Sequence, residues 1–300
     1  MKAAGRPLAA LIVMSILWGY GWVAMKIGLL DAQPFKFTAL RMSLSALVLL
    51  VALPLTGRRF LPTRLPEMIK LGMVQTTLLF TLSTWAVYVG SAGRVAFLVY
   101  TMPFFTLAMA WPMLGERVRG LQWPAIALAA TGMCAIIQPW DMGGDITGNL
   151  LAIGAGATWG LGAIMMKQIQ QRAPIDNLSL TAWQMTIGCI PLLGIAMVVP
   201  EAPIVWSERF IANLILLTVF ISGAGWALWV YALNHLTAGT ASLATLAAPV
   251  VAIIASAHVF GERPGTLEMT GMGLIVLALL VLSIHGMRTI HRSYTSAGEP

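Results

Sequence analysis

The sequence has 300 residues, of which 58% are hydrophobic and 10% charged, and its mean hydropathy is +0.83. A soluble domain carries about 25% charged residues, so this composition excludes an ordinary water-soluble protein and indicates a chain built to span a membrane. The net charge of +7 does not indicate a nucleic-acid partner, because the basic residues lie in loops between apolar segments, where membrane topology accounts for them.

Ten apolar segments follow one another along the chain, and each approaches the roughly 20 residues that a membrane-spanning helix needs. Turn-forming and polar residues separate them. The first segment is long enough to span and is followed by no polar domain, so we interpret it as a permanent helix. The predicted spans are 8–26, 36–55, 68–89, 93–114, 121–138, 149–167, 178–199, 211–233, 238–260 and 267–286. We therefore predict an all-α integral membrane protein with ten transmembrane helices.

The basic residues predict the orientation of these helices. If the N-terminus is cytoplasmic, twelve of the eighteen lysines and arginines fall inside and six outside. This bias places both termini in the cytoplasm and residues 289–300 in a cytoplasmic tail. We expect the protein in the inner (plasma) membrane.

Two segments of the chain repeat one another. Residues 18–26 read WGYGWVAMK and residues 159–167 read WGLGAIMMK, with five of nine positions identical at an offset of 141. Further on, a Gly, a Pro and a Gly-Glu-Arg triplet recur at an offset of 146, at Gly93, Pro103 and 115–117 and again at Gly239, Pro249 and 261–263.

The repeat divides the chain into halves at 1–140 and 147–288, each with five predicted spans. Because five is odd, the second half enters the membrane the opposite way round. Inverted repeats of this kind are typical of transporters, in which the site lies between the halves near the midplane. A simple anchor has no need of this symmetry.

The Trp-Gly start of each half, the Pro of each fourth helix and the Gly-Glu-Arg that follows it resemble the drug/metabolite transporter superfamily, in its EamA-type ten-helix form. Residues 34–41 resemble the second helix of that family, and Trp183-Gln184 resembles its variant in the second half. Members export amino acids and other metabolites, and some import solutes. The resemblance therefore implies a transporter, with export as the favoured direction, and does not give the substrate.

Pro103 and Pro249 occupy matching positions about halfway across the fourth and ninth spans. A proline inside a helix cannot donate to the carbonyl four residues back, which leaves the carbonyls of Val99 and Thr245 without that partner at mid-membrane. Such groups are tolerated where they face protein or a water-filled cavity. We interpret the prolines as helix breaks or hinges beside a cavity, with a simple packing kink as the alternative.

Two tryptophans, Trp18 and Trp159, lie too deep for an interfacial belt. Trp18 and Trp22 share one helix face with Lys26, and Trp159 repeats the position of Trp18. Trp18 and Trp159 are each about eight residues, or roughly 12 Å, from the charged ends of their helices. Trp18, Trp22 and Trp159 are therefore candidates for lining a substrate pathway, and packing between helices is the alternative.

Arg41 lies about two turns inside the second predicted span, where an ionisable residue is a functional candidate. It could bind a carboxylate or phosphate group, or extend to the outer interface as long basic side chains do. Gln75, Gln184 and Asn234 are amides within spans, and they either join helices or contact substrate. No Asp or Glu lies in mid-span, so we expect a carrier that is not coupled to protons through a buried carboxylate.

The sequence contains no GxSxG, HExxH or P-loop motif, and we predict that the protein is not an enzyme. Cys134 and Cys189 lack metal-ligand spacing, so we expect no metal and no cofactor. The leading interpretation is an exporter of a small amphipathic metabolite that works by alternating access. A non-transporting membrane protein (an intramembrane enzyme or an assembly factor) and a lipid or polyprenyl carrier stay open. The expected partners are a small-molecule substrate and the bilayer, and the protein could be a monomer or a homodimer.

Overall fold

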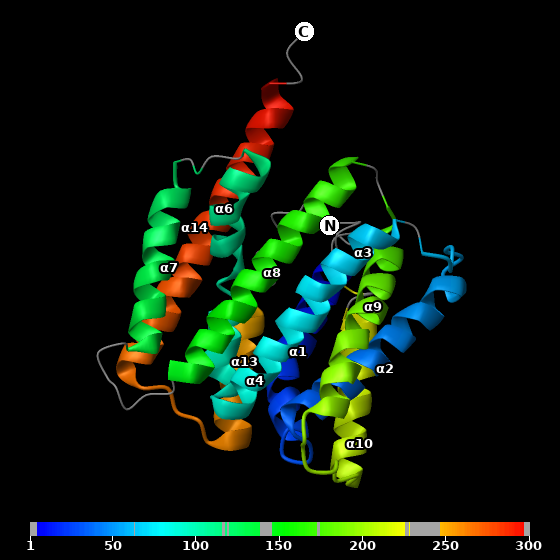
Figure 1. Ribbon diagram of the computed structural model, residues 1–300. Helices are drawn as coiled ribbons and strands as arrows, with labels where there is room; N and C mark the ends of the chain where they lie inside the picture. The colour runs from blue at the N-terminus through cyan, green and yellow to red at the C-terminus, as the bar shows by residue number, and fades with distance from the viewer. Residues whose placement is uncertain are drawn as a thin grey trace.

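The computed structural model describes residues 5–62, 64–115, 118, 120–138, 146–172, 175–225, 228 and 247–296. Within these ranges the chain is helical and contains no strand. The helices form a bundle in which α1 begins and α14 ends on the same side (Figure 1). Five of the helical stretches are long and apolar enough to cross a membrane, namely Ala9–Gly28, Pro34–Leu55, Ala92–Leu114, Ile146–Arg172 and Asn177–Val198. The chain is therefore an all-helical membrane protein.

The helices follow the predicted spans closely in the first half. They are α1 (Gly5–Gly28), α2 (Pro34–Leu55), α3 (Leu65–Gly72), the π-helix η1 (Met73–Leu78), α4 (Leu79–Val89), α5 (Ala92–Val99), α6 (Met102–Leu114) and α7 (Gln122–Ile137). The segments α3, η1 and α4 run on without a break and together form the predicted third span.

The second half contains α8 (Ile146–Arg172), α9 (Asn177–Val198), α10 (Glu208–Ile215), the π-helix η2 (Leu216–Ala224), α13 (Ala247–Phe260) and α14 (Thr266–Ser296). Residues 226–227 and 229–246 lie outside the described residues, so the predicted eighth and ninth spans are described only in part. The two π-helical stretches are in the third predicted span of each half, and π-helical turns often mark functional sites.

The predicted fourth span is two helices rather than one. Helix α5 ends at Val99, Tyr100 and Thr101 form a turn, and α6 starts at Met102 with Pro103 in its first turn. A proline in the first turn costs no hydrogen bond, because the amide there has no partner within the helix. The last carbonyls of α5 face α8, where a Cβ added to Gly156 would lie 3.1 Å from the carbonyl oxygen of Val99.

Contacts between the halves come in matching pairs. Helix α1 packs on α13 and α8 packs on α6, while α2 packs on α9 and α7 on α14. Gly19 lies against Ala248 and Val251, whereas Gly160 lies against Met102 and Phe105. These partners are 146 residues apart, the same offset as in the sequence repeat. Glycine at both positions lets the backbones approach closely, since a Cβ on Gly19 would lie 2.5 Å from the carbonyl oxygen of Ala248.

Candidate functional site

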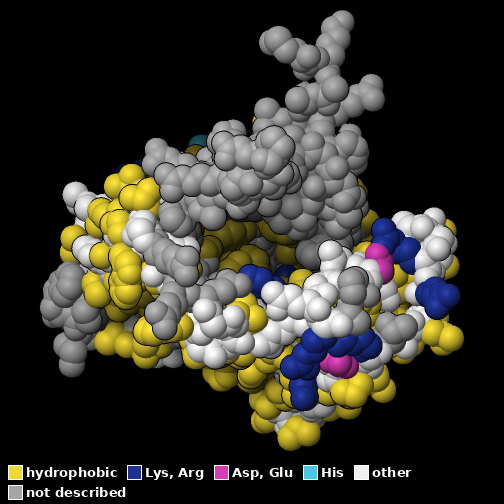
Figure 2. Space-filling view, turned by 90° about the horizontal axis from the view of Figure 1, so that it is seen from above, with side chains coloured by type: hydrophobic (Ala, Val, Ile, Leu, Met, Phe, Trp, Pro, Cys, Tyr) yellow, Lys and Arg dark blue, Asp and Glu magenta, His cyan; other side chains and the backbone are white. Residues whose placement is uncertain are grey.

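An internal cavity of about 230 Å³ lies among α1, α2, η1, α4, α8, α9 and η2. Figure 2 looks onto the side of the molecule where α14 ends and shows a hollow there, with hydrophobic side chains on its walls and basic atoms deep inside. The structure brings six of the seven predicted pathway residues to this cavity, namely Trp18, Trp22, Arg41, Gln75, Trp159 and Gln184. The seventh, Asn234, lies outside the described residues.

Aromatic side chains form one wall of the cavity. The rings of Trp22 and Tyr100 meet edge to face with centroids 6.4 Å apart, and those of Tyr100 and Trp159 do so at 5.6 Å. This wall therefore joins α1, the turn between α5 and α6, and α8. Tyr100 was not predicted as a site residue, although its place three residues before Pro103 could have indicated that a helix break would turn it toward the cavity.

Arg41 is the cationic residue of the cavity. Its side chain lines the cavity instead of extending to the interface, and the residue is only 5% exposed. The guanidinium carbon lies 5.1 Å from the ring centroid of Phe80 and 5.9 Å from that of Phe37. Within the part of the chain that the structure describes, Nε and Nη2 of Arg41 are buried without a hydrogen-bond partner.

The two amides of the cavity lie on facing helices. Gln75, on η1, packs against Gly162 of α8, where any side chain would overlap it. Gln184, on α9, is 4% exposed, and its Oε1 atom finds no hydrogen-bond partner among the described residues. Both amides are thus placed where they can contact a bound molecule.

The two prolines take different places relative to the cavity. Pro103 follows the turn at Tyr100, and both Tyr100 and Val99 line the cavity. Pro249 is buried near the first described residue of α13, Ala247. Pro249 would leave the carbonyl of Thr245 without a partner, but Thr245 lies outside the described residues. The hinge role of both prolines stays a prediction.

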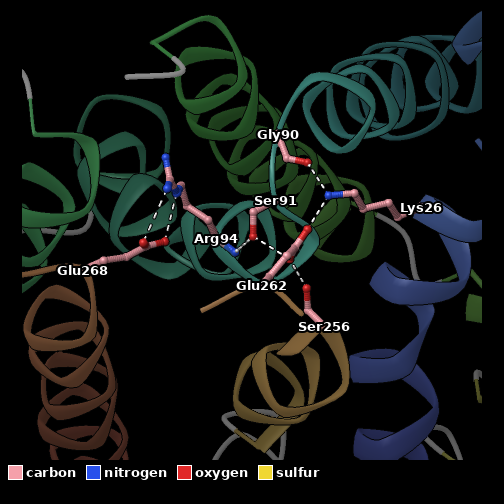
Figure 3. A network of polar contacts seen from close by, with 7 residues as sticks. All are labelled: Lys26, Gly90, Ser91, Arg94, Ser256, Glu262 and Glu268. Carbon is pink, nitrogen blue, oxygen red and sulfur yellow. Dashed lines mark hydrogen bonds and ion pairs between the residues drawn. The ribbon is translucent and has the colours of Figure 1, made fainter. Parts of the chain in front are cut away.

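A network of polar contacts gathers near the end of α1, at the turn between α4 and α5 and at the turn after α13 (Figure 3). Lys26, near the end of α1, forms an ion pair with Glu262 and donates to the carbonyl of Gly90 at 3.1 Å. Ser91 donates to the same carboxylate at 2.7 Å, and Ser256 of α13 donates to it as well. The network thereby ties α1 and the turn between α4 and α5 to the turn that follows α13.

A second ion pair stands beside the first. Nε of Arg94, on α5, donates to Glu268 of α14 at 2.9 Å. Burial raises the pKa of Glu262, but hydrogen bonds from Lys26, Ser256 and Ser91 outweigh it, so the pKa lies below its usual range. Sequence reasoning missed the pairing of Lys26 with Glu262. The only signal was that both residues belong to the repeated motifs.

Proteins of similar sequence and of similar architecture are known. The sequence matches the EamA-like transporter family twice, over residues 6–138 and again over 146–284. The chain belongs to the EamA-like transporter family. This confirms the resemblance drawn from the repeated motifs, and the names of the family and of its members indicate a transporter.

Two relatives and one solved structure are similar over nearly the whole chain. YvbV of Bacillus subtilis (strain 168), described as an uncharacterized transporter, is 28% identical and aligns over 94% of each chain. A protein of Salmonella typhimurium described as a probable amino-acid metabolite efflux pump is 26% identical over 94% of this chain and 95% of its own. A protein of known crystal structure superimposes with a TM-score of 0.66 at 16% identity, covering 94% of this chain and 98% of that one, which shows a shared fold.

Proposed function

We propose that this EamA-like transporter exports a small amphipathic metabolite from the cytoplasm by alternating access, as a plasma-membrane protein with ten spans and both termini inside. The observation that carries the proposal is the cavity, which receives Trp18 from the first half and Trp159, its repeat-related counterpart, from the second. Its volume of about 230 Å³ lies just below the range of about 300–1,000 Å³ for drug-sized ligands, which favours a small substrate. The efflux function in the name of the Salmonella relative supports the outward direction.

Two inverted halves, 1–140 and 147–288, explain how one site can face both sides in turn. Contacts of α1 with α13 and of α8 with α6 use glycines and partners in the same register, as Gly19 and Gly160 illustrate. Two halves that pack equivalently but point in opposite directions can exchange their arrangements, which opens the cavity first to one side and then to the other.

In this cycle the charged network closes the end of the molecule opposite the cavity opening. Lys26 lies near the end of α1 and Glu262 follows α13, and these helix ends are opposite the side of the molecule where α14 ends. The hollow of Figure 2 opens on the side where α14 ends. With both termini cytoplasmic, the structure is then an inward-open state whose outer gate is closed by the Lys26–Glu262 and Arg94–Glu268 pairs. The break before Pro103 and its counterpart Pro249 are the hinges that we propose for the exchange of states.

The test compares small molecules in the medium of cells that overproduce the native protein or its Pro103→Ala, Pro249→Ala form at equal membrane levels. Alanine supplies the amide that a helix running on through either proline position would use, so the variant should keep the fold but have stiffer breaks, and one chemical class should accumulate outside only with the native protein. Inside-out vesicles that receive that class in the external buffer then measure the direction of flow, because export corresponds to uptake into them. Equal accumulation with both forms would refute the hinges and leave export in place, whereas media that match those of cells without the protein would refute export through this site. Accumulation of lipid would instead support a lipid carrier.

A further inference from the structure

The most buried arginine that the structure describes has no anionic partner. Other described arginines pair with carboxylates, as Arg209 does with Asp31 at 2.8 Å and Arg94 with Glu268 at 2.9 Å. Arg41 is 5% exposed and its Nε and Nη2 donors lack partners, yet among the described residues that line the cavity there is no Asp or Glu. Buried charges in proteins are normally paired, so an anion is the missing element of this site.

The geometry of the free donors selects the anion. Nε and Nη2 lie on one edge of the guanidinium and direct two parallel N–H groups outward, which is the arrangement that binds both oxygens of a carboxylate. The rings of Phe37 and Phe80 contact the cation and restrict its movement. A phosphate would bring further negative charge, for which the cavity offers no second cation within the described residues.

The rest of the cavity selects the body of the ligand. Trp22, Tyr100 and Trp159 present aromatic surface, and the volume of about 230 Å³ limits the ligand to a small molecule. Gln184 adds a buried oxygen without a partner, which can accept a hydrogen bond from an amine or hydroxyl group.

We propose that Arg41 binds the carboxylate of the transported molecule, and that the substrate is a small monocarboxylate with an apolar or aromatic body. Gln184 accepts a hydrogen bond from a second polar group where the substrate carries one. This inference rests on the proposed transport function, because it names the substrate class of the same cavity.

The test measures binding without transport. The purified protein in lipid nanodiscs is titrated with three matched pairs, each a carboxylate and its neutral amide: butanoate and butanamide, 3-phenylpropionate and 3-phenylpropanamide, phenylalanine and phenylalaninamide. Quenching of tryptophan fluorescence reports binding, because Trp18, Trp22 and Trp159 line the cavity. The native protein should bind at least one carboxylate tenfold or more tightly than its amide, and the phenyl compounds more tightly than butanoate.

Variants of the cation complete the test. Arg41→Gln should abolish the preference for carboxylates, and Arg41→Lys should retain part of it, because an ammonium keeps the charge but loses the two-pronged geometry. Arg59→Gln removes an exposed arginine from the loop after α2 and is the matched control, with native binding expected. Thermal melting shows whether each variant is folded.

The outcomes separate this inference from the transport proposal. The inference is overturned if the native protein binds none of the carboxylates, if it binds acids and amides equally, or if a folded Arg41→Gln variant keeps the preference. A carboxylate preference that depends on Arg41, in a protein that moves nothing across vesicle membranes, would support the site and refute transport. Transport of neutral compounds by a protein with no preference for carboxylates would support transport and refute the carboxylate site.

Discussion

Arg41 in the cavity and Lys26 at the closed end are both cations at or within helices of the first half, but their surroundings differ. Lys26 has a carboxylate, Glu262, which lies 236 residues away and accepts further hydrogen bonds from two serines. Arg41 lies between aromatic rings, and Nε and Nη2 have no partner among the described residues. A charge paired within the protein stabilises one arrangement of the helices, whereas an unpaired buried charge is stabilised when a ligand arrives.

This contrast assigns different tasks to the two regions. The network binds parts of the chain to one another, so in the proposed cycle its ion pairs have to break when the outer side opens. In the proposed cycle the cavity binds a molecule that must enter and leave, which agrees with the atoms of Arg41 and Gln184 that have no partner among the described residues. Changes at the closed end should therefore alter the balance between states, and changes in the cavity should alter binding.

The largest expected effect comes from breaking the Lys26–Glu262 pair. Lys26→Met or Glu262→Gln leaves one partly buried group without its partner, which should shift the balance toward outward-open states by roughly 1–2 kcal/mol, about five- to thirtyfold. Met25, which lines the cavity next to Lys26, is replaced by Cys in a chain without its two native cysteines. The rate at which a membrane-impermeant thiol reagent labels this cysteine in intact cells should rise five- to thirtyfold, about the same factor as the shift between states.

The double variant Lys26→Met, Glu262→Gln should label no faster than the faster single variant, because both substitutions remove the same pair. Arg209→Gln provides the control. It breaks the pair with Asp31 near the same end without changing Lys26 or Glu262, so it should lower stability but leave labelling unchanged. Equal labelling in all variants would refute the outer gate.

A smaller effect is expected from Gly162→Ala, which tests the cavity. The added methyl group would overlap Gln75, whose flexible side chain then has to move into the space for substrate. We expect a cost of roughly 1 kcal/mol, or about a fivefold slower initial export rate at equal membrane levels. Gly194→Ala, with no atom within 4 Å of the added carbon, should leave export unchanged. A native rate in Gly162→Ala would show that Gln75 does not border the substrate.

The sequence predicted more of the cavity than of the closed end. Trp18, Trp22, Trp159 and Arg41 could be singled out because apolar surroundings make deep tryptophans and charges conspicuous. The partner of Lys26 could not be predicted, since a pair so distant in sequence depends on how α1 and α13 pack. The flanking of Arg41 by Phe80 likewise depends on the contact between α2 and α4.

The break in the fourth span shows the same limit on a local scale. Pro103 predicts an interrupted helix, but the sequence does not tell at which residue the turn begins. The structure places the turn at Tyr100 and Thr101, so that Pro103 falls in the first turn of α6, where its missing amide is not needed. The helix start, rather than a kink at the proline itself, turns Tyr100 into the cavity wall.

The smallest expected effect is that of pH on the outer gate. Because the pKa of Glu262 is lowered, the carboxylate is charged and the pair intact at any pH above the ordinary Glu value of about 4.3, and the stabilisation is lost only as the pH falls through the lowered pKa. Lys26 faces this carboxylate from α1, and the Arg94–Glu268 pair lies beside it. Labelling of Met25→Cys, corrected for the reagent's own pH dependence, should therefore stay constant from pH 8 to about pH 5.

Export should show the same insensitivity to a pH gradient, because no carboxylate lines the described part of the cavity to carry a proton across with the substrate. Vesicles with and without an imposed gradient measure this directly. Strict dependence of export on the gradient, with unchanged labelling of Met25→Cys, would leave the outer gate in place and require a proton-binding group elsewhere in the chain. Labelling that rises between pH 8 and pH 5 would instead show that protonation of the network itself opens the outer side.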